Sequence, residues 1–457
     1  MLSNTPDETT AIAIDTSPDN SFIYKGELGY QQLVLCAAAI GIAGGFVATA
    51  YYYVIEGSLH FVWHSLPEFL VPYFPSTFPA WNYVWIATTI GGFLVGLTLH
   101  LMGLPGEVSM VVDKVHDPGR IQVRQTPAMI VASLFSITAG GSAGPEAPLV
   151  QINGSLGGWL GQKLKLTTAT IRILTFCGMS AALGAFFGAP LGGALFALEI
   201  PHRRGLEYYE ALVPAVLSAI LSFVVFKFNT GLTIGGLYHF AAIPKLSLSH
   251  LGEGALLGGV GALVALIFVA VFRGIGYLSH YLEHQTILLA TLGGLSIGLI
   301  ALAYPQTLFF GEKEIETIVN TGAGFGATML LAIALAKMLA VSCTLHSGFR
   351  GGFIFPLFYI GAAVGLAISL AVPQIHPTIG MVCMMAAVNV AVTKTPISTT
   401  IILSVLSDTA MLPVIAIASF MSFLLTSKLC LIQTQRSRTL AIAAENPGNL
   451  TPALLSS

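Results

Sequence analysis

Long runs of apolar residues, separated by short polar stretches, cover most of the chain. They lie at about 32–55, 83–104, 170–200, 211–228, 253–278, 285–304, 325–345, 352–372 and 379–432. Several are as long as the roughly 20 residues that a helix needs to cross a bilayer. Apolar and polar residues do not alternate with a period of two, so membrane strands are not expected. The pattern predicts an all-α polytopic membrane protein.

Glycine and proline interrupt these runs in a way that repeats along the chain. Gly-Pro-Glu-Ala-Pro-Leu at 144–149 is followed by Gly-Ala-Pro-Leu at 188–191, and Gly-Phe-Ile-Phe-Pro-Leu at 352–357 is followed by Lys-Thr-Pro-Ile at 394–397. Pro148 and Pro190 are 42 residues apart in the first half, and Pro356 and Pro396 are 40 residues apart in the second. Repeated halves with interrupted spans are typical of transporters whose site lies at the ends of broken or re-entrant helices.

Composition supports a single membrane domain. Hydrophobic residues make up 55% and charged residues 9% of the 457 residues, against roughly 25% charged in soluble domains. We expect a polar, acidic and flexible cytoplasmic arm at 1–28, a membrane domain at 29–435 with halves at about 29–230 and 250–435, and a short cytoplasmic tail at 436–457. Five cysteines show no metal-type spacing and the net charge is only −2, so neither a metal, another cofactor nor a nucleic acid is expected.

Glu146 stands out because an ionisable group at membrane depth costs roughly 3 kcal/mol on insertion scales. Such a group normally faces a water-filled path or a partner. Glycine and proline around it allow a helix to begin inside the protein, where its first N–H groups attract anions. Burial disfavours an ionised carboxylate whereas helix N-termini favour it, so Glu146 is a candidate functional residue whose charge state depends on these opposing effects. The alternative is a structural acid paired with a lysine or arginine.

These segments resemble a known family. Gly-Pro-Glu-Ala-Pro at 144–148 is similar to the G-[R/K]-E-G-P motif of the CLC chloride channels and chloride/proton exchangers. The stretch at 188–199 resembles the family's A-P-L-x-G-x-L-F-x-x-E segment. The one at 352–356 resembles its G-x-F-x-P element, although the aromatic falls one position early. The resemblance runs from about 30 to 435.

The resemblance implies two inverted-topology repeats, assembled as a homodimer with one anion path per subunit. It makes Glu146 the gate and proton carrier. It places the chain in the bilayer of a bacterial inner membrane, with both termini cytoplasmic and no cytoplasmic regulatory domain. It also implies anion binding, largely by backbone amides, at seven positions: Pro105, Gly106, Glu107, Ala147, Phe353, Ile354 and Phe355.

Three departures from the family bear on mechanism. Pro105 falls where most members have an anion-binding serine, and a proline at this position resembles the family's plant nitrate exchangers. Ile432 falls at the position of the family's central tyrosine. Ile200 occupies the place of an internal proton-carrying glutamate. Glu199 is a candidate substitute, and its alternative is an interfacial acid near His202.

The sequence therefore predicts transport of chloride or a similar anion, gated by Glu146. It leaves open whether this transport is coupled to proton counter-transport. The alternatives are a passive voltage- or pH-gated chloride channel and a nitrate-preferring exchanger. An enzyme is not expected. A remote alternative is an intramembrane serine protease with Ser142 as nucleophile, which would need a histidine base beside it.

Overall fold

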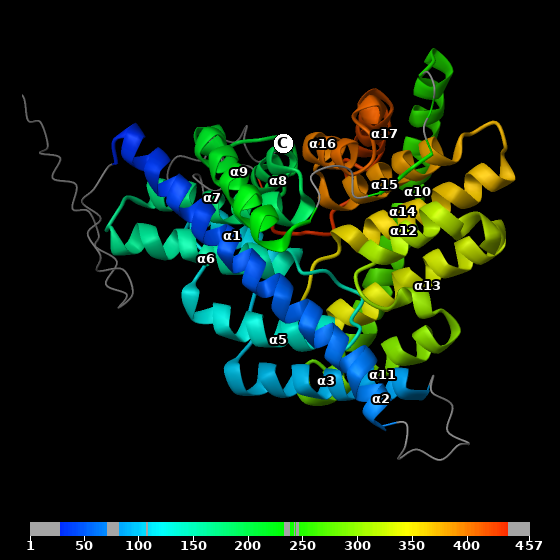
Figure 1. Cartoon of the computed structure of the whole chain (residues 1–457), viewed down its shortest axis with the longest axis horizontal. Coiled ribbons are helices and arrows are strands. Elements are labelled where there is room, and N and C mark those ends of the chain that lie inside the picture. The colour runs from blue at the N-terminus through cyan, green and yellow to red at the C-terminus, as the bar shows by residue number, and fades with distance from the viewer. Residues whose placement is uncertain are drawn as a thin grey trace, which may run out of the picture.

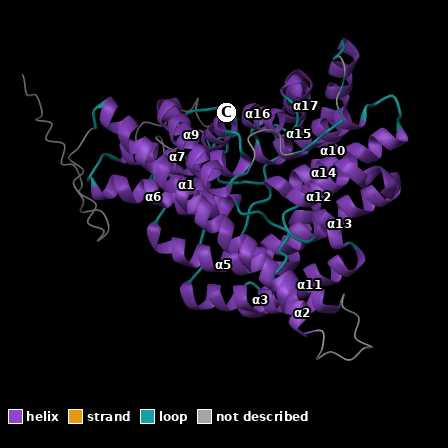
Figure 2. Cartoon of the chain, in the orientation of Figure 1, coloured by secondary structure: helices purple, strands orange, loops and turns teal. Residues whose placement is uncertain are grey.

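The computed structural model describes residues 28–70, 82–106, 108–232, 238–241, 243 and 246–436. Most of the predicted arm at 1–28 and of the tail at 436–457 therefore lies outside the described residues. Within them the chain is helical without any strand, as Figure 2 shows, and the prediction of an all-α membrane protein is confirmed. Eight stretches of the described chain are long and apolar enough to cross a membrane.

Most helices of the first half lie on the left of Figure 1, while α1 runs diagonally across the view to α2 at the lower right. The first of them, α1, continues through a π-helical turn at Phe61–Ser65 into α2. The helices of this half are α1 (Tyr30–His60), α2 (Leu66–Leu70), α3 (Asn82–Met102), α4 (Val108–His116), α5 (Thr126–Thr138), α6 (Glu146–Lys163), α7 (Thr168–Phe187), α8 (Pro190–Glu199) and α9 (Leu212–Thr230).

The second half lies on the right of Figure 1 and repeats this order. Its helices are α10 (Leu248–His280), α11 (Thr286–Ala303), α12 (Glu312–Thr321), α13 (Gly326–His346), α14 (Ile354–Ala371), α15 (Pro377–Thr393), α16 (Pro396–Leu406) and α17 (Leu412–Leu425). The packing repeats as well: α1 lies against α7 and α9 as α10 lies against α15 and α17, while α3 packs on its counterpart α11.

Two apolar runs are divided as the glycine and proline pattern predicts. The run at 170–200 breaks between α7 and α8, where Gly188 has φ 63°. The run at 379–432 breaks first between α15 and α16, where Lys394 has φ 63°, and again between α16 and α17. Gly188 and Lys394 both end their helix in the left-handed conformation, which stops the helix and lets a new one start at the next proline.

The core lies between the halves, around α14 and α15. Nearly every residue of both helices is buried, including small residues such as Gly361 and Gly365 that allow α14 to approach the backbone of α15 closely. Helices at the periphery, such as α9 and α10, expose large apolar side chains instead. A polar-poor exterior of this kind suits a protein surrounded by lipid.

Candidate functional site

The loops before α6 and α14 meet at the centre of the molecule. Gly144 and Gly352 form an isolated antiparallel bridge, in which each N–H donates to the other carbonyl at 2.8 and 2.7 Å. This contact joins the two repeated segments, which are 208 residues apart in the sequence. The first turns of α6 and α14 are therefore held beside each other.

Glu146, the first residue of α6, reaches across to the start of α14. Its side chain is 1% exposed, and Oε1 accepts a hydrogen bond of 3.0 Å from the N–H of Ile354. Oε2 has no hydrogen-bond partner among the described residues. The carboxylate thus occupies a place at a helix N-terminus that an anion would also occupy.

Glycine is required where this carboxylate lies. A Cβ atom added to Gly352 would collide with the side chain of Glu146, and one added to Gly144 would collide with its Oε2. The Gly-Gly start of the second repeat thus leaves room for the glutamate of the first.

A narrow cavity of about 50 Å³ lies next to Glu146 and has an almost wholly apolar lining. Ile200, at the end of α8, contributes to this lining. The predicted proton-glutamate position thus faces the same cavity as the predicted gate, but with an apolar side chain. Its other lining residues are Val111, Val112, Ala147, Val150, Met179, Leu183, Phe196, Gly352, Phe353 and Ile354.

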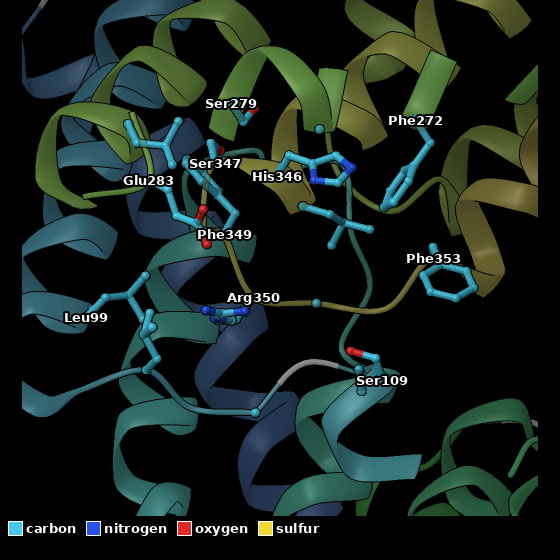
Figure 3. A pocket seen from close by; sticks show the side chains of 18 of the residues that line it. Leu99, Ser109, Phe272, Ser279, Glu283, His346, Ser347, Phe349, Arg350 and Phe353 are labelled. Atoms are coloured by element: carbon cyan, nitrogen blue, oxygen red, sulfur yellow. The ribbon is translucent and has the colours of Figure 1, made fainter. Parts of the chain in front are cut away.

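A wider cavity of about 450 Å³ lies next to the narrow one, and Val111, Ala147 and Phe353 line both. Gly106 and Ile432 also line it, so the structure brings two further predicted positions together there. Figure 3 shows Arg350 and Phe353 on one segment that passes through this region, with Ser109 below and His346 and Phe272 above.

Arg350 places a positive charge at the wide cavity. It is 5% exposed and comes three residues before Phe353, the residue that precedes α14. A guanidinium there raises the local concentration of anions in a low-dielectric passage. The two adjacent cavities thus have a cationic group in the lining of one and, in the lining of the other, a carboxylate at a helix N-terminus.

The remaining predicted positions differ in their placement. Pro105 is buried but does not line either cavity, and Glu107 lies outside the described residues. The ring of Phe355 packs among Phe186, Phe187 and other phenylalanines at centroid distances of 5.3 and 5.9 Å, so its side chain belongs to the core.

Glu199 is not an interfacial acid, contrary to one of the two readings of the sequence. It is fully buried at the end of α8 and binds the N-terminus of α16. Oε1 accepts from the N–H of Ile397 at 3.1 Å, and Oε2 accepts from the N–H and hydroxyl of Ser398 at 2.9 and 2.6 Å. Its charged neighbours in sequence suggested an interface, but its partner comes from the other half.

The protease alternative finds no base for its nucleophile. Ser142 is fully buried, and its hydroxyl oxygen has no hydrogen-bond partner in the part of the chain that the structure describes. Its backbone N–H donates instead to the hydroxyl of Thr344 at 3.1 Å.

Two buried polar residues were not singled out from the sequence. Lys337, in the apolar run of α13, is fully buried and donates to the carbonyls of Thr307, Leu308 and Phe309 at 3.1, 3.3 and 2.7 Å. Gln151, in α6, lies close behind Gly106. The signal for Lys337 was present, since an isolated lysine within an apolar run must find buried acceptors.

Solved structures share this architecture. A CLC-type fluoride/proton antiporter matches with a TM-score of 0.75 and 19% identity, covering 90% of this chain and all of that one. A slow cyanobacterial Cl⁻/H⁺ antiporter matches with a TM-score of 0.76 and 19% identity, covering 93% of this chain and all of that one. At this identity the likeness establishes the fold, with its inverted helical repeats.

Sequence comparisons identify the family. A chloride/fluoride channel protein of Pseudomonas syringae pv. tomato is 29% identical over 365 residues, which is 77% of this chain and 78% of the relative. The putative ion-transport protein YfeO of Salmonella newport is 26% identical over 418 residues, 88% of this chain and 97% of the relative. The family model described as voltage gated chloride channel matches residues 91–427. The chain therefore belongs to the voltage-gated chloride channel family, the CLC family.

Proposed function

We propose that this protein moves a small inorganic anion across the membrane by way of the two adjacent cavities, with Glu146 as the gate. The observation that carries the proposal is the hydrogen bond from the N–H of Ile354 to the Glu146 carboxylate. An anion entering the narrow cavity competes for that helix N-terminus, and the carboxylate must leave or take up a proton to admit it.

Chloride and fluoride are the proposed substrates. The Pseudomonas syringae relative is named a chloride/fluoride channel protein, and the two similar structures are titled fluoride/proton and chloride/proton antiporters. Nitrate is the further candidate, supported by Pro105 at the position of the family's serine. Backbone N–H groups donate hydrogen bonds to any of these anions, so the choice between them must be measured.

Coupling to protons is the second part of the proposal, and passive conduction is its competitor. The titles of the similar structures favour exchange. Ile200 favours conduction, because an apolar side chain in the narrow cavity offers a proton no group to bind. Assembly as a homodimer in a bacterial inner membrane, with cytoplasmic termini, rests on the family resemblance.

Flux from proteoliposomes tests both parts. Vesicles loaded with chloride or fluoride are diluted into low-anion buffer, and external anion and pH are recorded with and without a proton uncoupler. Uphill proton movement driven by the anion gradient indicates exchange, whereas rapid efflux without it indicates a channel.

The Glu146→Gln variant tests the gate. Glutamine cannot carry the charge that competes with the anion, so we expect efflux to continue without dependence on external pH and without proton movement. Glu316→Gln, which neutralises an exposed glutamate of α12, is the matched control and should behave as wild type. Unchanged pH dependence in Glu146→Gln would refute the gate role.

A further inference from the structure

Gln151 is a buried amide whose two polar atoms are both unsatisfied. Its side chain is 1% exposed, and neither Oε1 nor Nε2 has a hydrogen-bond partner among the described residues. Buried side-chain amides nearly always have partners, because an unmade hydrogen bond in the protein interior costs free energy. A ligand that hydrogen-bonds to this amide would explain why it is buried without a partner.

Gln151 lies on the side of α6 that faces the pathway. It follows Ala147, which lines both cavities, by four residues, so the two side chains project from the same face of the helix. Gly106 lies next to the Gln151 side chain: a Cβ atom added to Gly106 would be 3.4 Å from Gln151 Oε1. The amide thus lies behind Gly106, which lines the wide cavity, while Gln151 itself lines neither cavity.

The absence of a side chain at Gly106 brings this amide close to the cavity. Gly106 itself lines the wide cavity, and a Cβ atom there would stand against both the amide and the side chain of Met110. Because neither amide atom is bonded within the described chain, nothing there fixes which of them faces Gly106. The NH₂ group can therefore turn towards the cavity.

Asn153 is a second buried side-chain amide of α6, but it does not face the wide cavity as Gln151 does. It is also fully buried in α6, but its Nδ2 donates to the carbonyl of Gly44 at 3.5 Å, and its backbone carbonyl lies against Gly178. Asn153 therefore faces α1 and α7, away from the wide cavity. It provides a buried amide on the same helix for comparison.

We propose that the Gln151 side chain is an anion ligand, whose NH₂ group donates to a small halide held beside Gly106 and Ala147. This inference rests on the proposed function. Neither Pro105 nor Ile432 has a hydroxyl, so the two positions where the family has a hydroxyl supply no side-chain donor here. A neutral amide suits the task, because it donates to an anion without introducing a charge that would trap it.

Gln151→Met is the first test, because methionine keeps the length of the side chain and removes both polar atoms. Binding of sodium fluoride and sodium chloride to the purified full-length protein is measured by titration calorimetry, and thermal unfolding is followed with and without each salt. We expect anion binding about tenfold weaker, a smaller anion-induced rise in unfolding temperature, and no loss of stability without anion. Asn153→Leu should leave anion affinity unchanged.

The outcomes separate this inference from the proposed function. If wild type binds neither halide and transports neither, the proposed function itself fails. If wild type binds a halide and Gln151→Met binds it equally well, the ligand role is refuted. A fall in stability without anion, together with unchanged affinity, would assign the amide a structural role and also overturn the inference.

Gln151→Glu keeps the test open if the methionine variant does not fold. A carboxylate of the same shape repels the anion when ionised and donates a hydrogen bond when protonated. We expect weak halide binding at pH 7.5 that recovers at pH 5. Binding equal to wild type at both values would contradict the proposal.

Discussion

Replacing Glu199 with glutamine should destabilise the fold, because this carboxylate fixes the start of α16. Three donors converge on it: the N–H groups of Ile397 and Ser398 and the Ser398 hydroxyl, at 3.1, 2.9 and 2.6 Å. The side chain is fully buried, so water cannot take over any of these bonds in a variant. Glutamine has the same shape but presents an NH₂ group in place of one oxygen.

The magnitude follows from what glutamine can keep. A hydrogen bond to a charged group contributes about 1.5–3 kcal/mol net, and a neutral one about 1 kcal/mol. With its carbonyl towards Ser398, glutamine retains two neutral bonds and turns NH₂ towards the N–H of Ile397. One charged bond is lost and two are weakened, so we expect a loss of about 2–4 kcal/mol in the free energy of unfolding.

Thermal or denaturant unfolding of the purified protein, followed by tryptophan fluorescence, measures this effect. Ser398→Ala removes only the hydroxyl and should cost about 1–2 kcal/mol, placing it between wild type and Glu199→Gln. If Glu199→Gln unfolds like wild type but has lost proton transport, Glu199 is a proton carrier and not a fixed helix cap, and the reasoning from its three bonds fails.

Two further predictions concern a buried lysine and a buried histidine. Lys337→Met leaves the carbonyls of 307–309 without their donor and should lower the free energy of unfolding by at least about 3 kcal/mol. The control Lys313→Met, which removes an exposed ion pair, should lower it by less than about 1 kcal/mol. Burial lowers the pKa of His116, in the short helix α4, to about 4. Since the unfolded chain binds a proton near pH 6.5, the unfolding temperature should fall as pH drops from 6.5 towards 4. That fall should be smaller in His116→Gln and unchanged in His280→Gln, which alters an exposed histidine.

Local sequence signals predicted the helices and their interruptions well. Proline fits the first turn of a helix and glycine its end, so the repeated Gly and Pro spacing located the starts of α8 and α16 at Pro190 and Pro396. The short helix α4 was harder to predict, because its charged residues resemble those of a solvated loop. In the structure its last residue, His116, is buried and bonded to the carbonyl of Pro201 at 3.0 Å.

Contacts between the halves could not be predicted from residues near one another in sequence. The partner of Glu146 is 208 residues away and that of Glu199 is 198 or 199 residues away. Only the resemblance to a family suggested the first contact, and nothing suggested the second. Gln151 did not stand out in the sequence, because its unsatisfied amide and its position beside Gly106 depend on how the chain folds.

The two buried glutamates differ in how firmly their carboxylates are held, and we expect only Glu146 to move. Each reaches from the first half to the N-terminus of a helix in the second. Oε2 of Glu146 has no hydrogen-bond partner among the described residues, whereas both oxygens of Glu199 accept hydrogen bonds, from three donors in all. Breaking one charged bond costs about 1.5–3 kcal/mol, a factor of roughly 10–150 in population, which an arriving anion can offset by binding the same N–H. Breaking three costs too much for any single ion to compensate. Motion that admits an anion is therefore expected at the start of α14, while the start of α16 stays fixed.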